Sequence, residues 1–123
     1  MPKHVLIVED SRTQALRIQL ELQRYGLEIQ IAETGTAGLK SALQRPPDAI
    51  VLDVELPGMN GYTLCRMLKA DPRTAKIPII MLTRHDHADE TLKGLQVGAD
   101  DYIPKDTFAE QNLVESLRHL AIV

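Results

Sequence analysis

A chain of 123 residues, 44% hydrophobic and 25% charged, has the length and composition of one globular domain with a single core. Its net charge of -3 argues against nucleic acid as the main partner, and only four residues, three Tyr and one Phe, could stack on bases. No apolar run can cross a bilayer, no secretory signal follows Met1, and Cys65 is the single cysteine. We therefore expect one cytoplasmic domain, residues 1–123, with no output domain and no membrane contact.

Short apolar runs predict strands that are buried on both faces, as in a parallel sheet. They cover residues 5–8, 49–52, 79–82 and 102–104. A fifth segment, residues 28–32, alternates polar and apolar residues, which is typical of a less buried edge strand. The segments between the strands have helical periodicity, and they predict helices at about residues 11–25, 36–45, 62–70 and 88–97.

Two of the predicted helices begin with capping-box spacing. Ser11 opens the first helix, and Thr107 with Glu110 repeats the spacing before the last one. The last helix carries Leu113, Val114, Leu117 and Leu120 on one face, so we expect that face to pack against the sheet.

Five strand–helix units with right-handed crossovers predict a doubly wound parallel sheet between two helix layers, three layers in all. The chain is too short for an eight-unit barrel. GxGxxG does not follow the first strand, and GxxxxGK with serine or threonine does not occur, which argues against dinucleotide-binding and P-loop folds. The remaining arrangement is flavodoxin-like, with five strands in the order 2-1-3-4-5 and five helices.

Each buried run ends on, or is followed at once by, residues able to bind phosphate or a divalent metal: Glu9 and Asp10, Asp53, Thr83, and Lys105. In an open α/β sheet the ligand site lies outside the carboxyl ends of the strands, so we expect these side chains to converge. Three carboxylates beside one ammonium suit a hard divalent cation and a phosphoryl group. The sequence therefore predicts a phosphate and metal site.

Taken singly, these residues have ordinary explanations. A strand-end aspartate such as Asp53 often caps a helix or lies in solvent, and carboxylates are favoured before a helix amino terminus in any case. Only their common placement favours a site. The loop residues His85, Asp86 and His87 lack further ligands, so we expect no metal there, and Cys65 lies among apolar helix neighbours that favour packing.

Four stretches of this chain resemble the receiver domain of bacterial two-component response regulators, most of all its single-domain, chemotaxis-regulator-like members. They are VEDS at 8–11, VLDVELPGMNG at 51–61, MLT at 81–83 and GADDYIPK at 98–105, so the similarity covers essentially the whole chain. It implies that Asp53 accepts a phosphoryl group from a histidine kinase or a histidine phosphotransfer protein. The protein would be a signalling phosphoacceptor and no enzyme, although it would take phosphoryl groups from small donors and dephosphorylate itself.

The resemblance also implies a metal site. Glu9, Asp10 and Asp53 would hold Mg²⁺ together with the backbone carbonyl of Glu55, and Mn²⁺ would be able to replace it. The family usually has two aspartates where this chain has Glu9 and Asp10. Metal binding remains compatible with that variation, because both residue types offer carboxylate oxygens.

Further roles follow from the resemblance. Thr83 and Lys105 would bind the phosphoryl oxygens. Tyr102 would turn inward on activation and switch partner binding at the fourth helix, last strand and last helix, and a phosphorylation-dependent homodimer is a further expectation. Glu55 and His85, each two positions beyond a site residue, would tune the dephosphorylation rate.

The chain departs from the family pattern after the lysine. Most members have proline there, with a cis peptide bond before it, whereas Lys105 is followed by Asp106. A cis bond without proline costs about 3–4 kcal/mol. Either the protein bears this strain, or the bond is trans and Lys105 is aimed differently.

Two other functions remain open. The chain could be a receiver-fold docking module without a phosphorylation cycle, although the complete set of site residues argues against this. It could also be a phosphatase of the aspartyl-phosphate type, but that class has a second aspartate two residues after the nucleophile, where this chain has Glu55.

Overall fold

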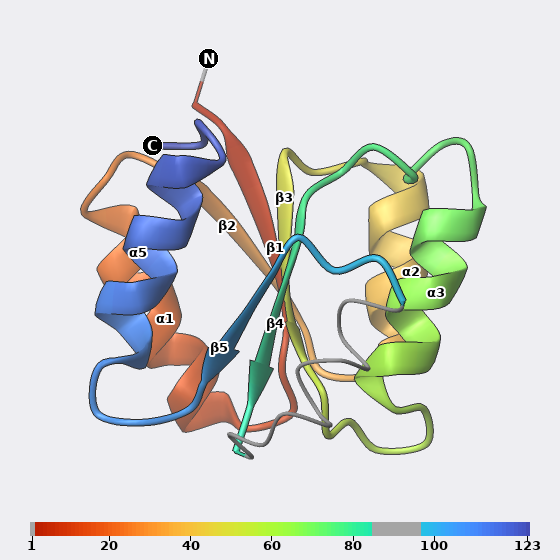
Figure 1. Ribbon diagram of the computed structural model, residues 1–123, viewed down its shortest axis with the longest axis horizontal. Coiled ribbons are helices and arrows are strands. Elements are labelled where there is room, and N and C mark those ends of the chain that lie inside the picture. Colours follow the sequence, from red (N-terminus) through yellow and green to blue (C-terminus); the bar gives the residue numbers. More distant parts are fainter. Residues whose placement is uncertain (1, 85–96) are drawn as a thin grey trace.

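The computed structural model describes residues 2–84 and 97–123. Strands and helices alternate along these ranges, and we name them by the labels of Figure 1. The strands are β1 (His4–Val8), β2 (Glu28–Ala32), β3 (Ala49–Asp53), β4 (Ile79–Thr83) and β5 (Asp101–Pro104). The helices are α1 (Arg12–Gln23), α2 (Gly35–Gln44), α3 (Gly61–Ala70) and α5 (Ala109–His119).

The five strands form one parallel sheet in the order β2-β1-β3-β4-β5. This confirms the predicted doubly wound, flavodoxin-like topology. Four helices lie in the described ranges, whereas five were predicted; the expected helix at about residues 88–97 falls almost entirely outside the described residues. Within these ranges, no helix combines the length and the apolar composition that crossing a bilayer requires.

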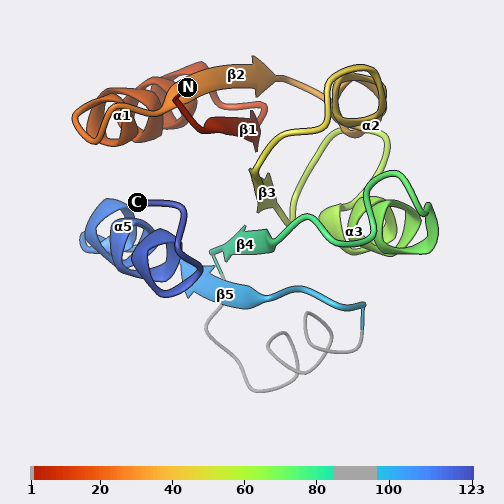
Figure 2. The same ribbon diagram turned by 90° about the horizontal axis from the view of Figure 1, so that it is seen from above.

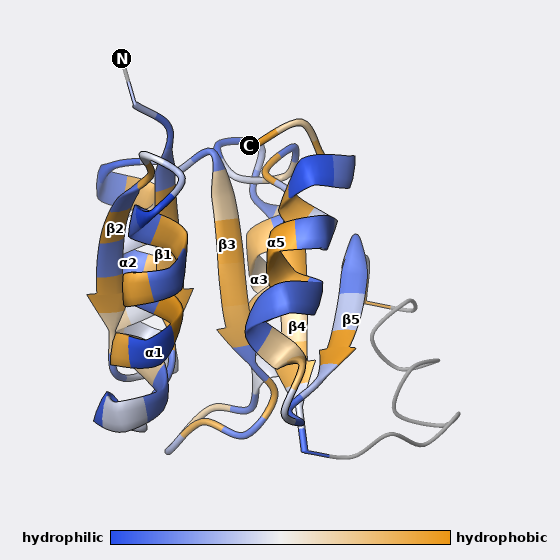
Figure 3. Ribbon diagram, turned by 90° about the vertical axis from the view of Figure 1, so that its left-hand side faces the viewer, coloured by the Kyte–Doolittle hydropathy of each residue, from blue (hydrophilic) through white to orange (hydrophobic). Residues whose placement is uncertain are grey.

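The sheet lies between two helix layers. Helices α1 and α5 cover one face, and α2 and α3 cover the other, as Figure 2 shows from above. Successive residues of β1 point to opposite faces: Val5 and Ile7 pack toward α1 and α5, whereas Leu6 and Val8 pack toward α2 and α3. Figure 3 shows the hydrophobic residues concentrated in the central strands and the hydrophilic ones on the side of α5 that faces the viewer.

The start of α1 agrees with the sequence-based prediction, whereas the start of α5 differs from it. Ser11 caps α1, and its Oγ accepts a hydrogen bond from the Gln14 amide at 3.3 Å, as predicted. The predicted cap at Thr107 is wrong, because α5 begins one residue later, after Phe108, with no side-chain cap. The physical reason is Asp106, whose Oδ1 accepts the Phe108 amide at 2.8 Å and closes the turn before the helix.

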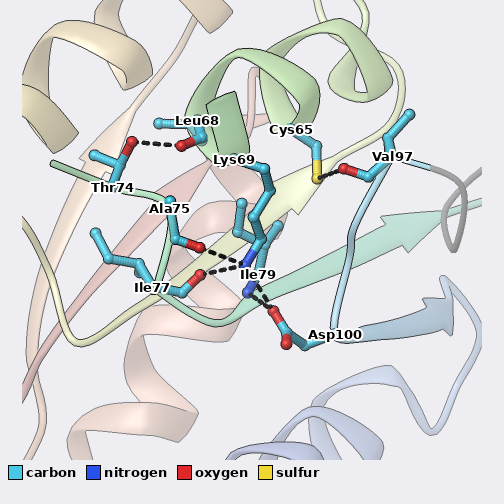
Figure 4. Close-up of polar contacts among 9 residues, drawn as sticks. All are labelled: Cys65, Leu68, Lys69, Thr74, Ala75, Ile77, Ile79, Val97 and Asp100. Carbon is cyan, nitrogen blue, oxygen red and sulfur yellow. Dashed lines mark hydrogen bonds and ion pairs between the residues drawn. The ribbon is translucent and has the colours of Figure 1, made fainter. Parts of the chain in front are cut away.

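A polar cluster joins α3 to the amino ends of two strands, at the edge of the sheet away from the predicted site (Figure 4). Lys69 Nζ donates to the carbonyl oxygens of Ile77 (2.8 Å) and Ala75 (3.4 Å), and it pairs with the Asp100 carboxylate at 3.2 Å. Asp100 also accepts the amide of Ile79, the first residue of β4, at 2.8 Å. This cluster fixes the loop after α3 and the entry to β5.

Cys65 has the packing role that its neighbours predict. It is fully buried, and its Sγ donates to the Val97 carbonyl oxygen at 3.5 Å. Burial raises the pKa of the thiol to about 11, so it stays protonated and unreactive near neutral pH.

Candidate functional site

The carboxyl ends of four adjacent strands bring the predicted site residues to one edge of the sheet, the lower edge in Figure 1. Two of these residues, Asp53 and Thr83, are the last residues of β3 and β4. Glu9 follows β1 directly, and Lys105 follows β5 directly. The fold therefore places them as the run endings predict.

Three carboxylates form a cluster at this edge. Glu9, Asp10 and Asp53 each place an oxygen within 4.8 Å of the others. Glu9 and Asp53 are buried, whereas Asp10 is exposed to solvent. Carboxylate oxygens at this spacing form a donor set that fits a hard divalent cation, with the exposed side left for water ligands.

Lys105 neutralises part of this charge. Its Nζ lies 2.8 Å from Glu9 Oε2 and 2.8 Å from Asp53 Oδ2, and its side chain is only 8% exposed. The peptide bond between Lys105 and Asp106 is trans. The missing proline therefore does not turn the lysine away from the site, and the Lys105 amide donates to the Thr83 carbonyl oxygen of the neighbouring strand.

Backbone amides hold the other oxygens of the two buried carboxylates. The Ser11 amide donates to Glu9 Oε1 at 3.0 Å, and the Glu55 amide donates to Asp53 Oδ1 at 3.1 Å. Sequence reasoning missed the role of Ser11 at Glu9, although a helix cap two residues after a carboxylate could have indicated it. Both side chains are thus fixed before any ligand binds.

Burial leaves Glu9 hard to ionise. Desolvation, with a smaller contribution from the nearby Asp53 charge, raises the pKa of Glu9 to about 7, and the hydrogen bonds from Lys105 and Ser11 oppose this rise. Three carboxylates lie here beside Lys105, the one lysine that the described residues place among them. A divalent cation would stabilise the ionised form of Glu9.

Three of the other predicted residues, Thr83, Tyr102 and Glu55, are also described by the structure. Thr83 is fully buried, one position beyond Leu82, which pairs with Asp53 in the sheet. Tyr102 is half-buried on β5 and packs against the core on the side of α2 and α3. Glu55 is exposed in the loop after β3, and His85 lies outside the described residues.

Comparison with known proteins identifies the family. The family model of the response regulator receiver domain matches residues 5–118. The chain is 37% identical over 113 residues to the DNA-binding dual master transcriptional regulator RpaA of Synechocystis, covering 92% of this chain and 46% of RpaA. It is 34% identical over 113 residues to protein PilH of Pseudomonas aeruginosa, covering 92% of this chain and 93% of PilH.

A solved structure agrees with these matches. The receiver domain of the sensor histidine kinase PA1611 of Pseudomonas aeruginosa, with a magnesium ion coordinated in its active site cleft, is 26% identical and superimposes with a TM-score of 0.86. The match covers 98% of this chain and 99% of that domain.

The chain spans about half the length of the first curated relatives, 46% of RpaA and 51% of the response regulator MprA. A family match over nearly the whole chain, on a sheet whose strand ends gather three carboxylates and a lysine, shows that this chain belongs to the response regulator receiver family.

Proposed function

We propose that this receiver domain takes a phosphoryl group onto Asp53 in a two-component phosphorelay. The donor would be a histidine kinase or a histidine phosphotransfer protein. An Asp53 oxygen attacks the phosphorus of the phosphohistidine, the phosphorus–nitrogen bond breaks, and the imidazole leaves with a proton. The observation that carries the proposal is the buried Asp53 carboxylate, fixed by Lys105 at 2.8 Å and by the Glu55 amide at 3.1 Å.

The neighbouring carboxylates support a Mg²⁺-dependent reaction. Glu9, Asp10 and Asp53 would hold the ion, with the Glu55 backbone carbonyl as a further ligand, and Mn²⁺ would substitute for it. When bound, the ion neutralises the negative charge that otherwise repels a phosphoryl group. The donor chemistry of this cluster fits the ion, since all the ligands are oxygens and one side is open to water.

Thr83 and Lys105 would bind the phosphoryl oxygens. The Lys105 ammonium lies against Asp53 already, so it can transfer its hydrogen bonds to an arriving phosphoryl group with little movement. The Thr83 hydroxyl would contact a phosphoryl oxygen in the phosphorylated state only, so its contacts would differ between the two states. Tyr102, half-buried on the neighbouring β5, would respond to that change.

The response would reach partners through β5, α5 and the predicted fourth helix, with homodimer formation as one outcome. The phosphodonor protein would approach between α1 and α5. A cavity of about 530 Å³ opens between α1 and α5, and Gln14, Arg17, Lys105 and Glu110 are among its lining residues. Lys105 lines this cavity and also pairs with Asp53, which supports docking of the donor at this place.

Labelling with acetyl phosphate and Mg²⁺, followed by intact-mass measurement, tests this function. We expect wild type to gain one phosphoryl group per chain and Asp53→Asn to gain none, because the amide is nearly isosteric but not nucleophilic. Rapid release of many phosphates per chain would identify a phosphatase instead. If folded wild type takes no label from acetyl phosphate or from a phosphorylated histidine protein, the proposal is wrong and the result favours a docking module without a phosphorylation cycle.

A further inference from the structure

Gly61 lies very close to the backbone at the end of β3, the strand that carries Asp53. It is the first residue of α3 and is buried, and its amide donates to the Val54 carbonyl oxygen at 2.7 Å. This hydrogen bond closes the loop of residues 54–60, which joins the end of β3 to α3. The start of the helix is thereby held against the backbone that carries Asp53.

A side chain at position 61 would have no room. A Cβ there would overlap the Asp53 carbonyl oxygen, and it would lie 2.8 Å from the Val54 Cα and 3.0 Å from the Asp53 carbonyl carbon. These are backbone atoms and cannot rotate away, as the end of a flexible side chain could. The close approach therefore requires glycine, for lack of a Cβ.

The strand is the less movable partner in this contact. β3 is central in the sheet, between β1 and β4, and the Val54 amide extends its pairing by donating to the Leu82 carbonyl oxygen at 2.9 Å. A Cβ at residue 61 would therefore push the start of α3 and the loop away from β3. That loop carries Glu55, whose amide holds Asp53 Oδ1.

We propose that Gly61 is a positioning residue for phosphorylation: its close packing on β3 sets the loop that orients the Asp53 carboxylate and presents the Glu55 carbonyl to the metal. Gly61 touches none of the reacting atoms itself. It acts through Glu55, which links the loop to Asp53. This inference rests on the proposed function of Asp53.

The test compares Gly61→Ala with wild type in Mg²⁺ titration calorimetry and in the rate of acetyl phosphate labelling. A misplacement of about 1 Å near reacting groups can reduce a rate about a hundredfold. We expect labelling to slow by at least about tenfold and Mg²⁺ affinity to fall about fivefold or more in the folded variant.

Gly26→Ala is the matched control, because Gly26 lies in the turn between α1 and β2, with φ of +76° and no atom within 4 Å of an added Cβ. It strains the backbone outside the loop of residues 54–60, so it should keep the Mg²⁺ affinity and labelling rate of wild type. If wild type is labelled, an unaffected Gly61→Ala, or an equal loss in Gly26→Ala, would overturn the inference alone. Unlabelled wild type would overturn the proposed function, and the inference with it.

Hydrogen exchange of wild type gives a second readout if Gly61→Ala fails to fold. Ligand binding suppresses any opening that breaks its site, by about a hundredfold at a concentration 100 times Kd. Mg²⁺ at that excess should therefore slow exchange of the Gly61 amide at least about tenfold, and slow the Ala75 amide, which bonds Asp71 in the loop after α3, much less. Equal slowing of both amides would contradict the inference.

Discussion

Glu9 should make the metal-free protein less stable as the pH rises, and Glu9→Gln should remove this loss. The side chain is only 2% exposed, and burial raises its pKa from 4.5 to about 7. Between these pH values the folded protein keeps a proton that the unfolded chain has released. The stability that Glu9 contributes is therefore fully present below about pH 4.5 and is lost as the pH rises through about 7.

The magnitude follows from the same pKa values. A rise from 4.5 to about 7 corresponds to roughly 3 kcal/mol above pH 7, at about 1.4 kcal/mol for each tenfold change in proton affinity. Glutamine has nearly the same shape, and its oxygen can still accept from Ser11 and Lys105. Because Lys105 loses one charged partner, we expect Glu9→Gln to exceed wild type in unfolding free energy by about 1–3 kcal/mol at pH 8, and by far less at pH 5.

Urea denaturation in a metal chelator, followed by circular dichroism at several pH values from 5 to 8, measures this difference. Glu33→Gln is the matched control, since the Glu33 side chain is 64% exposed and its replacement should change stability little at any pH. Added Mg²⁺ should reverse the order by stabilising wild type more than the variant. A difference between Glu9→Gln and wild type that stays constant from pH 5 to 8 would refute the reasoning.

Two further substitutions test other parts of the structure. Arg17→Glu, at the cavity between α1 and α5, should slow phosphoryl transfer from a histidine phosphotransfer protein about tenfold and leave acetyl phosphate labelling unchanged, whereas Lys40→Glu on α2 should affect neither. Equal slowing with both donors would show that Arg17 acts on the chemistry instead of on docking. Lys69→Met should lower the unfolding free energy, measured by urea denaturation, by about 1–3 kcal/mol, because two carbonyl oxygens and the Asp100 carboxylate lose their donor. Lys76→Met is the control, since Lys76 is exposed. An equal change in both variants would contradict the role of the cluster.

Local sequence patterns predicted the topology and the edge of the sheet that carries the site. The runs that end at Asp53 and Thr83 are apolar because β3 and β4 are buried on both faces, and that burial is visible in the sequence alone. The strand-end rule then placed the carboxylates near Lys105 without any coordinates. The order of the elements was therefore enough to predict which side chains would lie close together.

The details that depend on single contacts were not predictable in this way. The cap at Thr107 had the right spacing, but Asp106 competes for the Phe108 amide and delays α5. The trans bond after Lys105 and the contact of Gly61 with β3 depend on how separate segments approach one another. No local pattern reports such distances, because residues with the same spacing can meet or miss after a shift of about 1 Å.

The acids at the strand ends also explain why this edge differs from the rest of the core. Val8 and Leu52, the residues just before Glu9 and Asp53, are fully buried and apolar. Apolar residues in place of Glu9 and Asp53 would avoid the cost of desolvating a carboxylate, which is seen in the raised pKa of Glu9. Among the described residues, Lys105 is the cation that pairs with both buried carboxylates, so one positive charge is set against two negative ones. A cation that binds only the folded state offsets this desolvation cost. Glu9 therefore weakens the metal-free fold and strengthens metal binding. Relative to wild type, Glu9→Gln should have a higher unfolding free energy without Mg²⁺ and a lower one with Mg²⁺.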